Sequence, residues 1–390
     1  MPAFPILQFG TSRFLQAHVD LFVSQALARG EAAGRIAVVG TTASQDSRKR
    51  VKAFALDKPF PVRIRGIERG ALVDEVVEVD SVGMGVDANE NWSEVERLFV
   101  AARCVVSNTG DRGFETDAAD SRNSSPPRSF PAKIAKLLLA RHRAGAMPLT
   151  FFPCELTPDN GDTLRKIVSG ILEAWSAPAD VLAWANNRCV WANSLVDRIV
   201  STPLEPLGAV AEPYALWAIE NRPGLDLPCS HASIQVTNDL KRFERLKLYI
   251  LNLGHTLLAQ LWRQGGRDEM MTVREAMLDP YLRSRLDALY DDDALPIFAG
   301  IDMGEEARRY RTSVVERFSN PFLDHRLADI HLNHAAKARL RIGGLIELAK
   351  SCDRPVDTSR LEALLASSAD HQFTDAGRPR GRRTKHALDS

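Results

Sequence analysis

The sequence predicts an α/β protein in which a domain built on a mainly parallel sheet is followed by a mostly α-helical domain. Over the first half of the chain, short apolar runs alternate with amphipathic segments, as expected when helices connect parallel strands. From about Asp239, helical periodicity continues with few strand-like runs. We therefore expect a sheet domain at 1–238, a helical domain at 239–372 and a disordered tail at 373–390, where large apolar side chains are few.

The strands of the first domain are predicted from apolar runs that end in polar or glycine residues. Such runs occupy 5–9, 35–40, 104–110 and 148–156. Two further segments, 61–66 and 72–82, alternate apolar and polar side chains, which is typical of a β-hairpin. Helices are predicted between the runs, at 12–30, 44–57, 91–102, 129–145 and 160–175. Gly30 is a suitable C-cap for the first of these helices, and Pro131 suits the first turn of the fourth.

The second domain is predicted from five segments in which apolar residues recur every three or four positions. They span 240–262, 272–290, 305–318, 336–350 and 358–367. The polar, Pro- and Ser-rich segment 115–128 of the first domain is predicted to be an exposed loop instead.

The composition argues against several classes of protein. Fifty basic and fifty acidic residues cancel, so no global charge attracts nucleic acid or an anionic membrane. No run approaches the ~18 apolar residues of a membrane span, and the first residues lack the basic start of a signal peptide. The five cysteines are scattered, which favours reduced thiols over disulfides or a zinc site. We expect a cytoplasmic monomer or small homo-oligomer that acts on a small molecule, without nucleic-acid or membrane partners.

Three features of the first domain predict a dinucleotide cofactor. A strand, Gly10 and a helix follow one another, so backbone N–H groups and the helix dipole can face a pyrophosphate. The motif FGTSRF holds one glycine, so an ordinary strand-to-helix turn is the alternative. The other two features are the polar ends of later strands, at Thr41 and at "SNTG". The predicted cofactor residues are Phe9, Gly10, Thr11, Ser12, Arg13, Phe14, Thr41, Asn108 and Thr109.

The sequence leaves NAD and NADP open as the cofactor. An NAD site often has an acidic residue at the end of the second strand, but this strand ends in Gly40, Thr41 and Thr42. Ser44, Arg48 and Lys49 are suited to a ribose 2′-phosphate, or belong to the solvated first turns of a helix. We expect NAD and keep NADP as the alternative.

An ordered set of motifs resembles the polyol-specific long-chain dehydrogenases, that is, the mannitol dehydrogenase family. The motifs span about residues 6–345 and include QFGTSRFLQAH, VVSNTGDRGF, SFPAKIAKLL, CELTPDNGDTLRKIV, WANSLVDRIV, EPYALWAIE and KLYILNLGHTLLA. ELTPDNG, SFPAK, RGIERGALVDEV and NPFLDH are most similar to the altronate oxidoreductase (tagaturonate reductase) branch. The resemblance implies a Rossmann-like first domain and NAD(H)-dependent interconversion of a sugar acid and its keto form.

The resemblance also implies the catalytic residues. Lys247, Asn252 and His255 match the family signature K-x4-N-x2-H, with the lysine as general base. Asn252 and Asn193 match the donors that stabilise the developing oxyanion, and His255 would bind a neighbouring hydroxyl. On an ideal α-helix, the three signature side chains project at about 0°, 140° and 80°, within one broad face. The chain has no HExxH motif or clustered Cys/His set, so we expect no metal.

A sugar-acid substrate requires a cation for its carboxylate. Lys337 matches the substrate lysine of the family, and Arg198 is a second candidate. The signature reads LNLGH rather than LNG, with Leu253 after the asparagine, but the Lys–Asn–His spacing is kept. Asn221 stands where the family has an aspartate, and Asp329 stands where mannitol dehydrogenases have an arginine. These last two departures leave a mannonate/fructuronate or mannitol-type dehydrogenase as the alternative. A nucleotide-binding sensor without turnover is a further alternative from another class.

Overall fold

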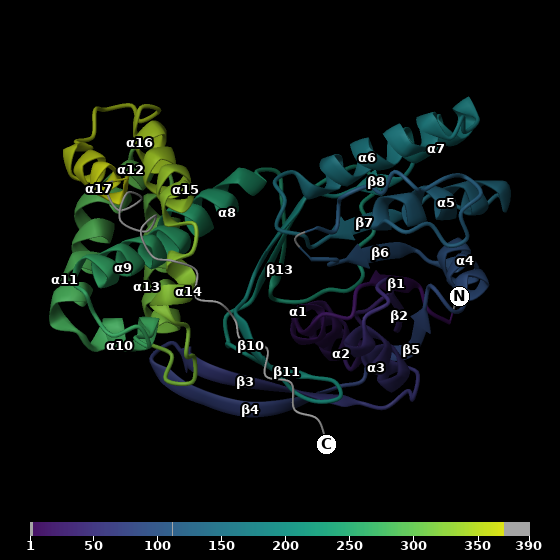
Figure 1. The fold of residues 1–390 in the computed structure, drawn as a ribbon, viewed down its shortest axis with the longest axis horizontal. Helices are drawn as coiled ribbons and strands as arrows, with labels where there is room; N and C mark the ends of the chain where they lie inside the picture. Colours follow the sequence, from purple (N-terminus) through teal and green to yellow (C-terminus); the bar gives the residue numbers. More distant parts are fainter. Residues whose placement is uncertain (1–2, 111, 370–390) are drawn as a thin grey trace, which may run out of the picture. The chain divides into compact units, whose positions relative to one another are not determined.

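The computed structural model describes residues 3–110 and 112–369, so the tail predicted at 373–390 lies outside the described residues. The chain divides into two compact units, Met1–Glu244 and Arg245–Ser390. Figure 1 shows strands with flanking helices in the first unit and helices in the second. The predicted fold class, a Rossmann-like α/β domain followed by a mostly helical region, is confirmed.

The first unit is built on a parallel six-stranded sheet with the order β5-β2-β1-β6-β7-β8. Chain order reverses between β1 and β6, so the carboxyl ends of these two strands border the crevice where ligands bind in such folds. β1, β2 and β6 are buried on both faces, which explains their continuous apolar runs. The strands are β1 (Ile6–Phe9), β2 (Ile36–Gly40), β5 (Val82–Asp87), β6 (Cys104–Ser107), β7 (Thr150–Pro153) and β8 (Val190–Trp191).

Helices cover both faces of this sheet, and alternate residues of β1 feed two separate cores. Ile6 packs with the helices on one face, whereas Leu7 and Phe9 pack with those on the other. The first face carries α1 (Arg13–Leu15), the π-helical turn η1 (Gln16–Asp20), α2 (Leu21–Leu27) and α3 (Gln45–Phe54). The second carries α4 (Trp92–Ala101), α5 (Phe130–Arg143), α6 (Asn160–Ala174) and α7 (Ala179–Asn187).

Two smaller sheets complete the first unit. The predicted hairpin is confirmed as β3 (Phe60–Glu68) and β4 (Ala71–Val79), paired antiparallel over their full length. The prediction merged β4 with the start of β5, because the polar residues between them continue the alternating pattern. β10 (Val200–Pro203) and β11 (Ala209–Ala211) extend the hairpin into one sheet, and β9 (Ser194–Asp197), β12 (Leu216–Glu220) and β13 (Ile234–Thr237) form the other.

Residues 245–369 contain helices and no strand. All five predicted helical segments are confirmed, but three contain a π-helical turn that the sequence did not indicate. The elements are α8 (Leu240–Leu246), η2 (Lys247–Asn252), α9 (Leu253–Gln264), α10 (Val273–Leu278), α11 (Pro280–Ala288), η3 (Leu289–Ala294), α12 (Leu295–Ala299), α13 (Gly304–Phe318), α14 (Leu327–His331), α15 (His334–Ala338), η4 (Arg339–Gly343), α16 (Gly344–Ala349) and α17 (Ser359–Ala369).

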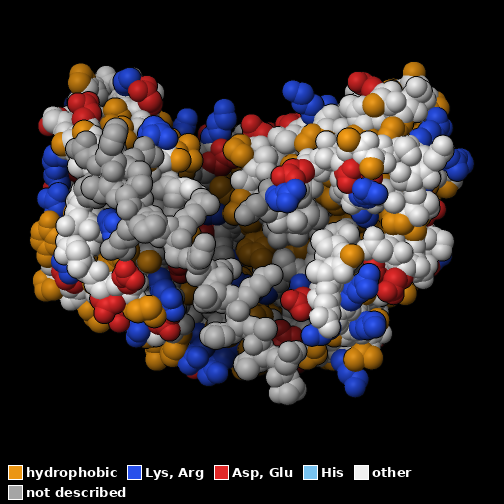
Figure 2. All heavy atoms as spheres, in the orientation of Figure 1, with side chains coloured by type: hydrophobic (Ala, Val, Ile, Leu, Met, Phe, Trp, Pro, Cys, Tyr) orange, Lys and Arg blue, Asp and Glu red, His pale blue; other side chains and the backbone are white. Residues whose placement is uncertain are grey.

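Surface charge and helix length agree with the composition. On the face that Figure 2 shows, basic and acidic side chains lie interspersed with polar and apolar ones. Within the described part of the chain, every helix is too short or too polar to cross a membrane.

Candidate active site

The turn after β1 brings two predicted cofactor segments into close contact. Gly10 has a φ of +116°, and a Cβ at this position would overlap the carbonyl oxygen of Asn108. The N–H of Gly10 donates to the Val39 carbonyl at 3.1 Å. Ser12 Oγ donates to Asn108 Oδ1 at 3.2 Å and accepts the N–H of Leu15, so it also caps the following helix. Gly10, Ser12 and Asn108 therefore meet at the carboxyl ends of β1 and β6.

The remaining predicted residues of this turn have different environments. Phe9 is fully buried, and its ring centroid lies 5.4 Å from that of Phe130, so its side chain supports the core. Thr11 is also buried, while Arg13 is exposed to solvent. Phe14 stacks on a neighbouring histidine ring at 4.8 Å. Within this turn, the backbone and the Ser12 hydroxyl are thus the groups best suited to a ligand.

Glu155 is a buried carboxylate that the sequence prediction missed. Its Oε2 accepts a hydrogen bond from Ser107 Oγ at 3.0 Å, and its Oε1 accepts two from Thr109, from N at 3.0 Å and from Oγ1 at 2.9 Å. Burial raises the pKa of Glu155, and these hydrogen bonds oppose that shift. Asn108 Nδ2 donates to the Cys154 carbonyl at 2.8 Å. The loop after β7 thus fixes the predicted cofactor residues after β6. The available signal in the sequence was an acidic residue within the apolar run 148–156.

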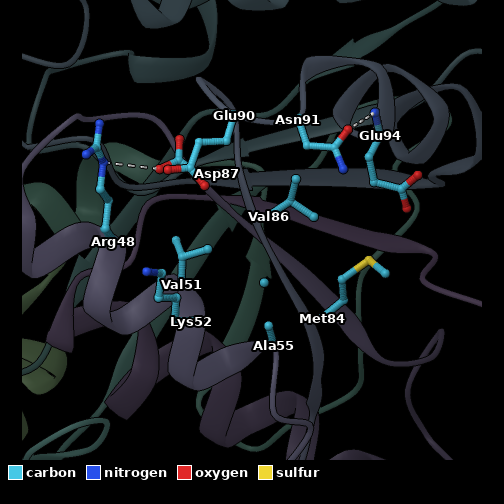
Figure 3. A pocket seen from close by; sticks show the side chains of 11 residues that line it. Arg48, Val51, Lys52, Ala55, Met84, Val86, Asp87, Glu90, Asn91 and Glu94 are labelled. Carbon is cyan, nitrogen blue, oxygen red and sulfur yellow. Dashed lines mark hydrogen bonds and ion pairs between the residues drawn. The ribbon is translucent and has the colours of Figure 1, made fainter.

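Thr41, the predicted residue after β2, is half-buried. A cavity of about 350 Å³ lies nearby, beside α3 and β5 (Figure 3). Arg48 and Asp87 face each other at its rim, with Arg48 Nε 3.6 Å from Asp87 Oδ2. None of the described residues that line this cavity belongs to the predicted cofactor set; they are Arg48, Val51, Lys52, Ala55, Met84, Gly85, Val86, Asp87, Glu90, Asn91 and Glu94.

Asn193 is buried between two carboxylates of the first unit. Its Nδ2 donates to Asp162 Oδ2 at 3.0 Å and to Glu220 Oε2 at 2.9 Å, and its Oδ1 accepts the N–H of Asp162 at 3.0 Å. Arg222 donates to the same two carboxylates. Chiefly through the hydrogen bonds from Arg222, the pKa of Asp162 falls to about 2. The structure therefore holds the Asn193 amide in one orientation within a charged network.

The two predicted substrate residues of this unit, Arg198 and Asn221, have side-chain partners outside that network. Arg198 is buried, and its guanidinium donates to the backbone carbonyls of Glu212 and Ala17. Burial lowers the pKa of Arg198 to about 10. These bonds engage the guanidinium of Arg198 with backbone carbonyls of its own unit. Asn221 is exposed, and its Nδ2 donates to Asn238 Oδ1 at 3.0 Å.

The signature residues of the second unit begin on a π-helical turn. Lys247 is the first residue of η2 and Asn252 the last, and both are half-buried. The N–H of Leu253 is shared between the carbonyls of Ile250 and Leu248, and the bond to Leu248 spans five residues instead of four. Because π-type bonds link residues five apart, side chains with this spacing lie closer together than on an α-helix. The geometry of this turn thus differs from the α-helical projection expected from the sequence.

His255 and Lys337 belong to one cluster in the same unit. The His255 ring stacks on Phe318 at 4.4 Å and meets the His325 ring edge-on at 5.1 Å. Burial lowers the pKa of His325, and the nearby charge of Lys337 lowers it further while Asp329 opposes the shift. Lys337 Nζ donates to the Ile330 carbonyl at 2.8 Å. His325 therefore contacts the predicted hydroxyl-binding histidine and is also within electrostatic range of the predicted substrate lysine.

Arg341 joins this cluster to the π-turn. Its Nη1 donates to the Asn252 carbonyl at 3.1 Å and to Thr256 Oγ1 at 2.8 Å. Burial lowers the pKa of Arg341 to about 10. The pKa of Lys337 is also lowered, chiefly by burial and secondly by the charge of Arg341. Among the residues with described positions, no three His, Cys, Asp or Glu side chains gather as a metal ion requires.

Comparison with protein families gives two matches along the chain. Residues 5–226 match the mannitol dehydrogenase Rossmann domain, and residues 239–381 match the mannitol dehydrogenase C-terminal domain. An altronate oxidoreductase of Halalkalibacterium halodurans is 32% identical over 363 residues, which cover 86% of this chain and 69% of that protein. An altronate oxidoreductase of Bacillus subtilis is 28% identical over 360 residues, covering 86% and 73%.

Solved structures give the same fold. A D-sorbitol dehydrogenase in substrate-free form matches with a TM-score of 0.80 at 23% identity, over 93% of this chain and 79% of that one. Mannitol 2-dehydrogenase of Pseudomonas fluorescens, in a ternary complex with NAD and D-mannitol, matches with a TM-score of 0.69 at 19% identity, over 93% and 84%.

Proposed function

Because the chain belongs to the mannitol dehydrogenase family, we propose that it interconverts a sugar acid and its keto form, of the altronate–tagaturonate type, with NAD(H). In coarser terms, it is an oxidoreductase of polyols or sugar acids that uses a nicotinamide nucleotide. The observation that most supports the finer proposal is the cluster in the second unit. There, Arg341 donates to the Asn252 carbonyl, the His325 ring meets that of His255, and the charge of Lys337 acts on His325.

The turn after β1 fits a dinucleotide. Gly10 lets the backbone pass close to Asn108, and the helical segment that starts at Arg13 directs its N-terminus toward the carboxyl end of the sheet. When bound, the nicotinamide exchanges a hydride with the substrate carbon. The surroundings of Ser44 and Arg48 favour NAD over NADP. The Ser44 hydroxyl already caps α3, and a 2′-phosphate would compete with Asp87 for Arg48.

The polar residues of the second unit can perform the proton chemistry of a secondary alcohol. Lys247, in its neutral form, would accept the hydroxyl proton as the carbon is oxidised, and would return it in reduction. The Asn252 amide would donate to the oxygen as negative charge develops, without titrating itself. His255 would bind an adjacent hydroxyl and orient the sugar chain. Lys337 would pair with the substrate carboxylate, a strong charge-assisted contact that neutral polyols cannot make.

Turnover measurements test this proposal. Nicotinamide absorbance is followed with altronate, mannonate, mannitol and arabinitol, each with NAD and NADP. We expect turnover with altronate and NAD to exceed the others. Preference for neutral polyols would replace the sugar-acid assignment with the mannitol-type alternative, and absence of any turnover would favour a nucleotide-binding sensor.

A variant of the proposed base tests the mechanism. Lys247→Ala should reduce turnover by at least ~1,000-fold, while NADH binding, followed by fluorescence, stays within about twofold. Lys241→Ala is the matched control, because Lys241 is an exposed lysine of α8, six residues earlier. Activity that survives in Lys247→Ala would refute the role of this lysine as base.

A further inference from the structure

The proposed base and oxyanion donor lie five positions apart in the sequence, and the helix geometry between them decides how they face the substrate. On a regular α-helix, Lys247 and Asn252 would project about 140° apart. η2 places them at the two ends of one π-helical turn, closed by the bond from Leu253 N to the Leu248 carbonyl. A five-residue repeat brings positions i and i+5 onto one side of the helix. The π-turn therefore reduces the angle at which the two residues project from the helix.

Side chains from two other segments hold carbonyls of this turn. The Tyr290 hydroxyl, from η3, donates to the Ile250 carbonyl at 2.9 Å. Arg341 Nη1, from η4, donates to the Asn252 carbonyl at 3.1 Å. The Ile250 carbonyl also accepts the N–H of Leu253, and the Asn252 carbonyl also accepts the Thr256 hydroxyl. Because a carbonyl oxygen can accept two hydrogen bonds, the two side chains add to the bonds within the helix. The two donors thus stabilise the π-turn against relaxation to a regular α-helix.

Gly254 makes room for the hydroxyl of Tyr290. A Cβ on Gly254 would overlap the Tyr290 oxygen and lie 3.0 Å from both Tyr290 Cζ and Phe318 Cε2. Tyr290 is 0% exposed, so its hydroxyl has no open path to another position or to water. Burial also raises the pKa of Tyr290, which keeps the hydroxyl protonated and able to donate. Gly254 and Tyr290 therefore form one steric unit, and Gly254 lies two positions after the signature asparagine.

We propose that Tyr290, admitted by Gly254, is a positioning residue that holds the π-turn and thereby sets the Lys247 side chain against the Asn252 amide. This inference rests on the proposed function, in which Lys247 is the base and Asn252 the oxyanion donor. It also accounts for a glycine two positions after the asparagine in LNLGH. Tyr290 acts through Ile250 and touches none of the proposed reacting groups in the described contacts.

The substitution Tyr290→Phe in the full chain tests the proposal, because it removes only the hydroxyl. A misplacement of about 1 Å costs up to ~100-fold in rate, so we expect kcat to fall by ~10–100-fold. We also expect the pH of half-maximal kcat to move, because the surroundings of Lys247 change, while NADH affinity stays within about twofold. Tyr310→Phe is the matched control, since Tyr310 is another buried tyrosine of this unit, whose oxygen accepts from Arg317 at 3.3 Å. It should leave kcat and the pH midpoint unchanged.

A double-mutant cycle tests the steric unit. Gly254→Ala alone should reduce kcat more than Tyr290→Phe alone, because the new methyl group would clash with the Tyr290 hydroxyl. The double variant Gly254→Ala/Tyr290→Phe should recover part of that loss, which is a non-additive result. Additive losses, or a Tyr290→Phe enzyme with wild-type kcat and pH midpoint, would overturn the inference.

Different results would refute the role of Lys247 as base and the positioning role of Tyr290. If Lys247→Ala retains activity, the assigned base is wrong and the proposed mechanism fails. If Lys247→Ala is inactive while Tyr290→Phe behaves as the wild type, the mechanism stands and the positioning role of Tyr290 fails. If Tyr290→Phe lowers only the melting temperature, with kcat and the pH midpoint intact, the tyrosine is structural and the inference is also overturned.

Discussion

Glu155 is the residue whose replacement most directly tests how the end of β6 is held. Its carboxylate is 5% exposed and accepts three hydrogen bonds, one from Ser107 and two from Thr109. Glu155→Ala removes every one of these acceptors and leaves a cavity. The two hydroxyl donors can rotate toward other partners, but the N–H of Thr109 has a fixed direction. We therefore expect Glu155→Ala to disorder the β6 loop and weaken cofactor binding.

The magnitude follows from the groups that lose their partners. A buried N–H without an acceptor costs about 1–3 kcal/mol, and truncating a buried side chain of this size adds roughly 1–2 kcal/mol for the cavity. The sum predicts a loss of about 2–5 kcal/mol in the free energy of unfolding. Glu155→Gln keeps one oxygen for both donors of Thr109 and turns its amide toward Ser107 Oγ, which can accept. Its cost should stay below about 1 kcal/mol.

The stability difference between Glu155→Gln and the wild type should depend on pH. Burial raises the pKa of Glu155 in the folded state above its unfolded value. The stability contributed by the neutral acid is therefore complete below the unfolded pKa and is lost as pH rises through the folded pKa. Glutamine cannot ionise, so the stability of Glu155→Gln relative to the wild type should increase as pH rises through that window.

Urea unfolding between pH 4.5 and 8 measures the stability of the three proteins, and NADH fluorescence titration measures cofactor affinity. The wild type and Glu155→Gln should bind NADH within about threefold of each other, whereas Glu155→Ala should bind at least ~10-fold more weakly. Equal behaviour of the Gln and Ala variants would refute the reasoning, because it would mean that the acceptors of Glu155 hold nothing in place.

Three further predictions concern the first unit. Gly10→Ala should raise the Kd for NADH at least ~10-fold in a fluorescence titration, because its Cβ would overlap the Asn108 carbonyl at a φ of +116°. Burial, with two neighbouring arginines, lowers the pKa of His231 to about 4. The free energy of unfolding should therefore fall by up to about 3 kcal/mol as pH falls from 6.5 to 4, and a His231→Gln variant should lose less over that range. Arg222→Met should lower the unfolding free energy by about 1 kcal/mol at pH 7 after solvent screening, and the difference should shrink as Asp162 protonates between pH 3.8 and about 2.

The sequence predicted the parallel sheet well because its strands are buried on both faces. Continuous apolar runs and the helices between them leave few alternatives for 5–9, 35–40 and 104–110. The short strands between Val190 and Thr237 were missed because several are half-exposed and only two to five residues long, so their pattern resembles that of a loop. The boundary between β4 and β5 was missed because the residues between them include neither glycine nor proline.

Site residues could be predicted to the extent that their role depends on local motifs. The polar ends of β1 and β6 were visible, and Gly10 and Asn108 meet where the topology requires. Arg198 is an example of what the sequence could not predict. Its position in WANSLVDRIV does not reveal that its guanidinium donates to the carbonyls of Ala17 and Glu212. The π-turn could not be predicted from the sequence either, since the Tyr290 hydroxyl that bonds to it lies forty positions after Ile250 in the chain.

The two asparagines predicted as oxyanion donors differ in what their amides already bind. Both N–H groups of Asn193 donate to carboxylates, so presenting one to a substrate means giving up Asp162 or Glu220. Arg222 lowers that cost, because it already bonds both carboxylates and would keep either one satisfied. For Asn252, the described contacts to Arg341 and Thr256 engage the backbone carbonyl, so they fix the residue without using its side-chain amide. In the proposed mechanism, Asn252 would therefore donate without giving up a described hydrogen bond, whereas the donor strength of Asn193 would depend on the charge state of its neighbours.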